Sequence, residues 1–202
     1  LWDIDVANYA MSVCSDSRYY MPEHYERVHN NPQKGYFNSG VLVMNLDYWR
    51  KNHISDKCLI YLKEHKDEVI YMDQDVMNAI VIEQVIWMPY KFNFQVGCIS
   101  SHNFNLYDEK HKKEVLEAYE NPLIIHYLGP SKPWHLMYHN CAYERLWRHY
   151  QRKSPWRWHY QLGGNKRPIK FINSLIKHFL WLFGLGNRLH GYAKEIDCTK
   201  VL

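Results

Sequence analysis

Strand-like apolar runs alternate with helical patterns along the first 150 residues of the chain. Short apolar segments bounded by turn residues predict strands at 6–13, 41–44, around 85–87 and at 123–128. Apolar residues at helical spacing predict helices over 47–66, 73–85, 108–120 and 138–150. This alternation predicts an α/β fold with a mixed, mostly parallel sheet.

Two polar side chains lie where predicted strands end. Asp16 follows the strand at 6–13, and His126 closes the apolar part of the run that starts at Leu123. Ligands of α/β sheets bind beyond the carboxyl ends of strands, so both are candidate site residues. The continuous apolar segment Val41–Met44 predicts a strand covered on both faces, with a turn at 38–40 directly before it.

Charge is distributed unevenly along the chain. The 202 residues carry a formal net charge of +4, yet no Asp or Glu occurs between Glu144 and Glu195. This basic C-terminal segment favours an anionic surface as a partner. Aromatic residues make up 16% of the chain, which suits carbohydrate stacking and membrane interfaces but equally an ordinary large core. No recognisable DNA or RNA module is present, so no nucleic-acid partner is expected.

The five cysteines are widely spaced and form no CxxC pair. This pattern argues against a disulfide framework and a zinc ribbon and favours a reducing compartment. No segment resembles a signal peptide, and no apolar run reaches the roughly 18–20 residues that span a bilayer. The sequence therefore predicts a cytoplasmic location.

The turn after the last predicted strand combines three chemically useful residues. His126 offers an imidazole nitrogen to a divalent metal, Gly129 permits close backbone approach, and Lys132 adds a cation between two prolines. Together these groups suit a diphosphate. Taken singly, a histidine at a strand end is more often structural, and that alternative stays open.

Two further candidates have equally ordinary alternatives. Asp73 and Gln74 begin a predicted helix, where they suit sugar hydroxyls, but acids there also compensate the helix dipole. Asn38 lies in a predicted turn, where an Asx turn is the commoner explanation. A metal-dependent hydrolase using Asp73, Asp75 and His126 is a weaker alternative, because more convergent ligands are needed.

Four segments in unbroken order carry a family resemblance. They are "YFNSGVLVMNLDYWR" (36–50), "YMDQDVMNAI" (71–80), "WMPYKFNFQ" (87–95) and "IIHYLGPSKPWH" (124–135). Together they resemble the family-8 glycosyltransferases, above all the bacterial branch that builds lipopolysaccharide. The resemblance implies the Rossmann-like GT-A fold. It also implies a hexosyltransferase that moves glucose or galactose from a UDP-sugar to a hydroxyl of a lipopolysaccharide or other surface glycan, with retention of configuration. The implied cofactor is a divalent cation, Mn²⁺ or Mg²⁺.

The resemblance also assigns roles to individual positions. It makes His126 a metal ligand that also approaches the diphosphate, and it assigns Gly129 and Lys132 to diphosphate binding. The residues that it places around the donor or acceptor sugar are Asp16, Asn38, Asp73 and Gln74, of which Asp73 and Gln74 are also assigned to catalysis. Because an amide is a poor nucleophile, we favour same-face attack of the acceptor over a covalent intermediate on Gln74.

One departure from the family pattern concerns the metal. Family members bind it chiefly through an Asp-x-Asp motif after a strand, and Asp3-Ile4-Asp5 fits that pattern only superficially, because no strand-like run precedes it. We therefore expect the remaining ligands upstream of Leu1 and the N-terminal part of the GT-A domain to be missing. On this interpretation the 202-residue chain binds metal and UDP weakly and is inactive alone.

The sequence predicts two regions. Residues 1–150 form the C-terminal portion of the catalytic domain, and residues 151–202 form a basic, aromatic tail. Apolar residues recur at helical spacing from Pro168, amid lysines and arginines, which predicts an amphipathic helix on an anionic membrane through 166–190. This favours a peripheral position on the inner face of the plasma membrane. The alternatives are packing against the domain and a dimer contact.

A second function from another class is compatible with these features. Without its metal motif, the chain would be a non-catalytic sugar- or membrane-binding domain derived from such an enzyme.

Overall fold

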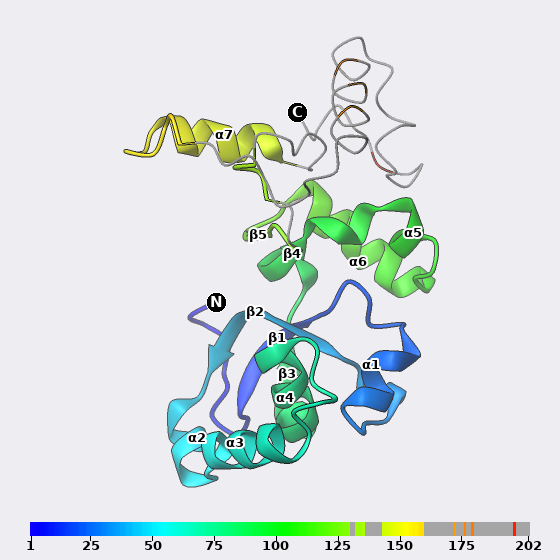
Figure 1. The fold of residues 1–202 in the computed structure, drawn as a ribbon, viewed down its shortest axis with the longest axis vertical. Coiled ribbons are helices and arrows are strands. Elements are labelled where there is room, and N and C mark those ends of the chain that lie inside the picture. Colours follow the sequence, from blue (N-terminus) through cyan, green and yellow to red (C-terminus); the bar gives the residue numbers. More distant parts are fainter. Residues whose placement is uncertain are drawn as a thin grey trace. The chain divides into compact units, whose positions relative to one another are not determined.

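The computed structural model describes residues 1–129, 132–135 and 143–159, and the single residues 172, 176, 179 and 196 (Figure 1). The chain forms two compact units. Unit 1 comprises Leu1–Phe94 and Lys113–Ile124, and unit 2 comprises Gln95–Lys112 and Ile125–Leu202.

Unit 1 is built on a three-stranded sheet in the order β2-β1-β3. Its strands are β1 (Met11–Ser15), β2 (Phe37–Met44) and β3 (Val85–Trp87). β1 is antiparallel to β2 and parallel to β3, so the α/β class and the mixed sheet are confirmed, although parallel pairing does not predominate. Because β2 is an edge strand, its residues 41–43 are half-buried and Met44 is exposed, and the prediction that both of its faces are covered is wrong.

The first strand begins later than predicted. Residues 1–10 are turns and irregular backbone, and β1 starts at Met11. Side chains satisfy the polar backbone groups of this segment: Asp5 Oδ1 accepts from the Ala7 N–H, and the Asn45 amide donates to the carbonyls of Val6 and Ala7. Since these groups are satisfied outside a sheet, the apolar character at 6–10 does not extend the strand.

Four helices lie wholly in unit 1: α1 (Pro22–Arg27), α2 (Leu46–Lys51), α3 (Ile54–Glu64) and α4 (Met72–Val81). The helix predicted over 47–66 is divided because His53 adopts a left-handed conformation with φ of 52°. The α4 prediction is confirmed. It packs against α3 and β2, and its residues Met77 and Val81 join a core with Met11, Val13 and Phe37.

The second sheet has two short strands, β4 (Phe94–Gln95) and β5 (Ile125–His126). The long buried strand predicted at 123–128 is wrong: β5 is half-buried and two residues long. The amides of Leu123 and Ile124 both donate to the Lys91 carbonyl, so these two residues do not extend β5. The 3₁₀ helices are Pro32–Lys34, Ile82–Gln84, Tyr90–Asn93 and Val96–Ile99.

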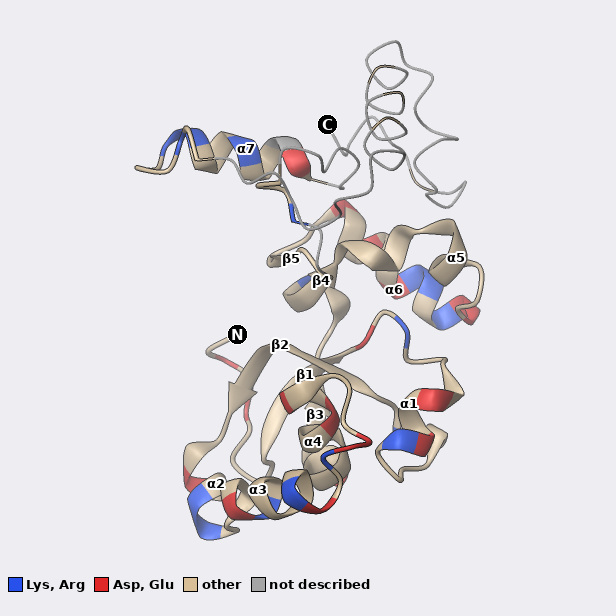
Figure 2. Ribbon diagram, viewed as in Figure 1, with Lys and Arg blue, Asp and Glu red and all other residues tan. Residues whose placement is uncertain are grey.

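The remaining helices are α5 (Ser101–Phe104), α6 (Glu109–Glu120) and α7 (Glu144–Arg152). The helix predicted at 108–120 is confirmed as α6, and most of the helix predicted at 138–150 is found in α7, while 138–142 lie outside the described residues. α7 starts with an acid and ends with basic residues, which suits the helix dipole (Figure 2).

Most of the predicted membrane segment 166–190 lies outside the described residues. Ile172, Ile176 and Phe179 are described, and each is helical and exposed. In the part of the chain that the structure describes, no helix has the length and apolar character needed to cross a bilayer. The division into 1–150 and 151–202 stays a prediction.

Candidate active site

Three of the predicted site residues in unit 1 share a hydrogen-bonded cluster. Asp16 follows β1, Asn38 lies in β2, and Gln74 lies in the first turn of α4; all three are buried. Asn38 Nδ2 donates to Asp16 Oδ2 at 3.1 Å and to Gln74 Oε1 at 3.0 Å, and Gln74 Nε2 donates to Asp16 Oδ2 at 3.2 Å. The cluster presents one carboxylate and two amides, which are groups that hydrogen-bond sugar hydroxyls.

A bulge places Asn38. The register of β1 with β2 passes from Val13 opposite Leu42 to Cys14 opposite Asn38, which leaves 39–41 unpaired with β1. Asn38 Oδ1 accepts from the Gly40 N–H at 3.0 Å and from Asn93 Nδ2 at 2.9 Å. The prediction of a turn before the strand is therefore wrong in position, because the Asx-type bond is made within β2.

Asn78 holds Gln74 and the start of β2 in place, and this role was not predicted from the sequence. Its Oδ1 accepts from the Phe37 N–H, and its Nδ2 donates to the Phe37 and Gln74 carbonyls, all at 2.9 Å. Asn78 lies one helical turn after Gln74, so it couples the first turn of α4 to β2. Its only signal in the sequence is an amide on the apolar face of a predicted helix.

Asp75 serves a structural role next to Gln74. It is 1% exposed and accepts from Arg27 Nε at 2.8 Å, the Tyr36 hydroxyl at 2.5 Å, and the amides of Ile70 and Tyr71 at 2.8 Å. Burial alone would raise the pKa of Asp75, but these hydrogen bonds hold that pKa below its ordinary value. Since both of its oxygens are occupied by donors, the alternative of a hydrolase that uses Asp75 as a metal ligand loses support.

Asp73 differs from its neighbours. It lies in the same first turn of α4 as Gln74, but it is exposed, while Gln74 and Asp75 are buried. The structure thus brings Asp16, Asn38 and Gln74 together without Asp73. The role that the family resemblance gives Asp73 stays a prediction.

The predicted diphosphate residues lie in unit 2. His126 ends β5, and Gly129 has φ of 78°, a conformation that glycine adopts without strain. Among the described residues, a Cβ at Gly129 would meet no atom within 4 Å, which suits close approach of a bound group. Lys132 Nζ donates to the Tyr127 carbonyl at 2.5 Å, and its backbone N–H donates to His135 Nδ1 at 3.2 Å.

An aromatic groove in unit 2 was not predicted. The ring centroids of Trp134 and Trp147 are 5.8 Å apart. The groove measures about 550 Å³ and is lined by Trp134, Trp147, Tyr150, Gln151, Ser154, Trp156 and His159. The groove accounts for part of the aromatic excess of the sequence. Its residue Trp134 belongs to the same turn as Lys132.

The described residues around His126 do not supply the further ligands of a metal centre. Among the described residues, the one group of three or more metal-ligating side chains is His29, His65 and Glu68, and His126 does not belong to it. One imidazole does not hold a divalent cation by itself. The described residues therefore do not form the implied Mn²⁺ centre, and no chemical step is assigned to a cation here. Asp5 of the Asp-Ile-Asp sequence accepts the Ala7 amide in an Asx-type turn.

Comparison with known proteins decides the family. The family model described as glycosyl transferase family 8 matches residues 1–137, which is more than half of the chain. The chain belongs to this family. This agrees with the resemblance carried by the four sequence segments and confirms it.

Two curated relatives show what this family-8 chain is similar to. It is 31% identical over 139 residues to General stress protein A of Bacillus subtilis, covering 66% of this chain and 46% of the relative. It is 29% identical over 168 residues to lipopolysaccharide glucosyltransferase WaaO of Escherichia coli, covering 81% of this chain and 47% of the relative. The chain thus spans about half the length of these relatives.

A solved structure extends the likeness to the fold. The galactosyltransferase LgtC, solved in complex with donor and acceptor sugar analogs, matches with a TM-score of 0.56 and 26% identity, over 67% of this chain and 49% of that one. The family-8 chain therefore has the GT-A fold that the sequence predicted.

Proposed function

We propose that the protein is a retaining hexosyltransferase that moves glucose or galactose from a UDP-sugar to a hydroxyl of a lipopolysaccharide or other surface-glycan acceptor. The observation that carries this proposal is family-8 membership over residues 1–137. Similarity to a lipopolysaccharide glucosyltransferase supports the acceptor class. The buried Asp16–Asn38–Gln74 cluster supports the sugar-binding role.

The three cluster residues would bind the hydroxyls of the donor hexose. Their carboxylate and amide groups hydrogen-bond one another, so their side chains are fixed before a sugar arrives. Preorganised polar groups bind a hydroxylated ligand with a smaller ordering cost. The Gln74 amide, which is not nucleophilic, would orient the sugar while the acceptor attacks from the face that the diphosphate leaves.

The turn from His126 to Lys132 would bind the diphosphate. Negative charge grows on the leaving diphosphate as the glycosidic bond breaks, and a cation and backbone N–H groups aimed at it stabilise the transition state. Lys132 would exchange the Tyr127 carbonyl, its present acceptor, for a phosphate oxygen. The left-handed backbone at Gly129 would allow the phosphate close approach. Mn²⁺ or Mg²⁺ belongs to the proposal through the family resemblance alone.

The test is a donor screen on the protein in the form that cells make. UDP release is measured with Mn²⁺ and a lipid-linked oligosaccharide acceptor, using UDP-glucose, UDP-galactose and UDP-N-acetylglucosamine in turn. We expect turnover with one of the two hexoses at a rate in the usual range of about 1–10³ s⁻¹. Binding of the acceptor without UDP release from any donor would support the non-catalytic alternative instead.

We further propose that residues 166–190 attach the protein peripherally to the inner face of the plasma membrane. Ile172, Ile176 and Phe179 are helical, 54%, 52% and 60% exposed, and separated by four and three positions, so they share one face. Basic residues accompany this face in the sequence, as in helices that lie on anionic bilayers. An apolar stripe accompanied by basic residues supports the membrane role.

Removal of residues 163–202 is expected to abolish co-sedimentation with vesicles that contain anionic lipid. A matched variant, Ile172→Asp with Phe179→Asp, should weaken vesicle binding while the basic residues remain. Binding of the unaltered chain should fall as salt rises, because charge attraction is screened. Co-sedimentation that is unchanged after the deletion would contradict the membrane role.

A further inference from the structure

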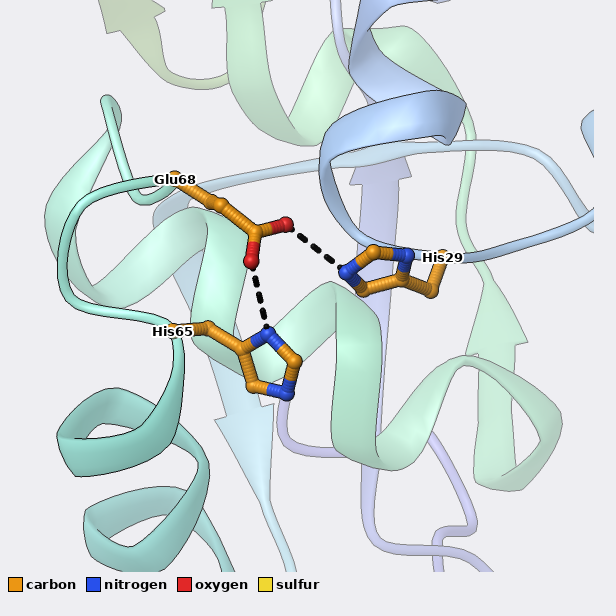
Figure 3. Close-up of side chains that lie close together, drawn as sticks. All are labelled: His29, His65 and Glu68. Atoms are coloured by element: carbon orange, nitrogen blue, oxygen red, sulfur yellow. Dashed lines mark hydrogen bonds and ion pairs between the residues drawn. The ribbon is translucent and has the colours of Figure 1, made fainter.

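Two histidines and a glutamate converge on the surface of unit 1, and none of them belongs to the Asp16–Asn38–Gln74 cluster. His29 follows α1, His65 ends α3, and Glu68 lies in the turn after α3. His29 Nε2 lies 2.8 Å from Glu68 Oε2, and His65 Nδ1 lies 3.0 Å from Glu68 Oε1. Figure 3 shows the carboxylate between the two imidazole rings, with one oxygen directed at each.

The donor set has the chemistry of a transition-metal site. Two imidazoles and one carboxylate form the His₂Glu set that binds Zn²⁺ and leaves a coordination position open. One donor atom from each residue lies within 4.8 Å of the others, so small side-chain rotations suffice to close them around an ion. The side chains are 55%, 29% and 45% exposed, which gives an ion access and lets water complete the coordination.

Local structure holds the three donors in place. The His65 ring stacks on Tyr61 with centroids 4.3 Å apart, and the His65 carbonyl accepts from the Glu68 amide at 3.0 Å. His29 has a left-handed backbone with φ of 52°.

We propose that His29, His65 and Glu68 form a Zn²⁺-type divalent metal site, separate from any cation that serves sugar transfer. The site would join the segment after α1 to the turn before α4. Arg27, two residues before His29, binds Asp75, and Ile70 and Tyr71, just after Glu68, also donate to Asp75. A bound ion would therefore stabilise the hydrogen bonds that Asp75, the neighbour of Gln74, accepts from both segments, and its role is structural.

The test is calorimetric titration of the metal-free chain with ZnCl₂ alone, together with Co²⁺ absorption and thermal unfolding. We expect one site that gains visible Co²⁺ bands, and a rise in Tm of roughly 5–10 °C at a Zn²⁺ concentration about a hundred times Kd. Glu68→Gln and His65→Gln should each remove the Co²⁺ bands and the rise in Tm, because each deletes a ligand without a large change in volume.

His53→Gln is the matched control. His53 also has a left-handed backbone and also pairs with a carboxylate, that of Asp56, but no second histidine of the described part of the chain joins them. Its variant should bind Zn²⁺ as the unaltered chain does. Zn²⁺ binding that survives Glu68→Gln and His65→Gln, or no Zn²⁺-dependent change in Tm in the unaltered chain, would overturn the site and leave a His–Glu–His hydrogen-bond relay.

Discussion

Replacement of Asp75 by alanine is expected to lower the free energy of unfolding by about 3–5 kcal/mol, because it leaves the largely buried Arg27 guanidinium without its partner. The same change deprives the Tyr36 hydroxyl and the amides of Ile70 and Tyr71 of their acceptor. Urea unfolding followed by circular dichroism measures the loss. Asp73→Ala is the matched control, since Asp73 is exposed in the same helical turn, and its cost should stay within about 0.5 kcal/mol.

The difference in free energy of unfolding between the unaltered chain and Asp75→Ala depends on pH through the pKa of Asp75. That pKa is lowered in the folded state, so the carboxylate stabilises the fold fully at pH values above its unfolded pKa of about 3.9. The contribution is lost as the pH falls through the lower, folded-state pKa. The stability gap between the unaltered chain and Asp75→Ala should therefore be constant from about pH 5 to 7 and shrink in acid. A gap that widens on acidification would contradict the assigned ion pair.

Replacement of Lys132 by alanine is expected to reduce kcat by about 10²–10³-fold, the range found when one group that stabilises transition-state charge is removed. If Lys132 acts on the charge that develops as the glycosidic bond breaks, kcat and kcat/KM should fall together. UDP release at saturating donor measures this. The loss of the bond from Lys132 Nζ to the Tyr127 carbonyl is a small structural effect by comparison.

Lys112→Ala is the control for general loss of positive charge, because Lys112 forms an exposed pair with Glu109 on α6. Its kcat should be unchanged. A Lys132→Ala protein with unaltered kcat and a raised KM for the donor would show that Lys132 contributes only to ground-state binding. Unaltered kcat and KM would remove Lys132 from the site.

Hydrophobic periodicity predicted which segments form helices better than it predicted how the strands pair. The apolar stripe of α4 and the charged helix α6 are visible in the sequence, because helical spacing records which face is buried. The bulge at 39–41 is not visible, because register depends on which residue of β1 faces Asn38. The division between α2 and α3 depends on the left-handed backbone of His53, for which a histidine is only a weak signal.

The candidate site was predicted in part. The family resemblance identified Asp16, Asn38 and Gln74, and the structure joins them by hydrogen bonds. The sequence offered Asp75 as an acid that compensates the helix dipole or as a hydrolase ligand, because a sequence cannot show that Arg27, 48 residues earlier, supplies its counter-ion. The His29–His65–Glu68 group was missed for the same reason: His29 is distant in the chain from His65 and Glu68, and the three residues form no motif.

The central claim is that this family-8 chain takes part in retaining transfer of a hexose from UDP. The most direct test is NMR spectroscopy of the product formed from the accepted UDP-hexose, whose sugar is α-linked to the diphosphate, by the protein in the form that cells make. We expect stoichiometric UDP and a new α-glycosidic linkage. A β-linked product, or no UDP from either UDP-glucose or UDP-galactose with Mn²⁺ and acceptor present, would contradict the claim.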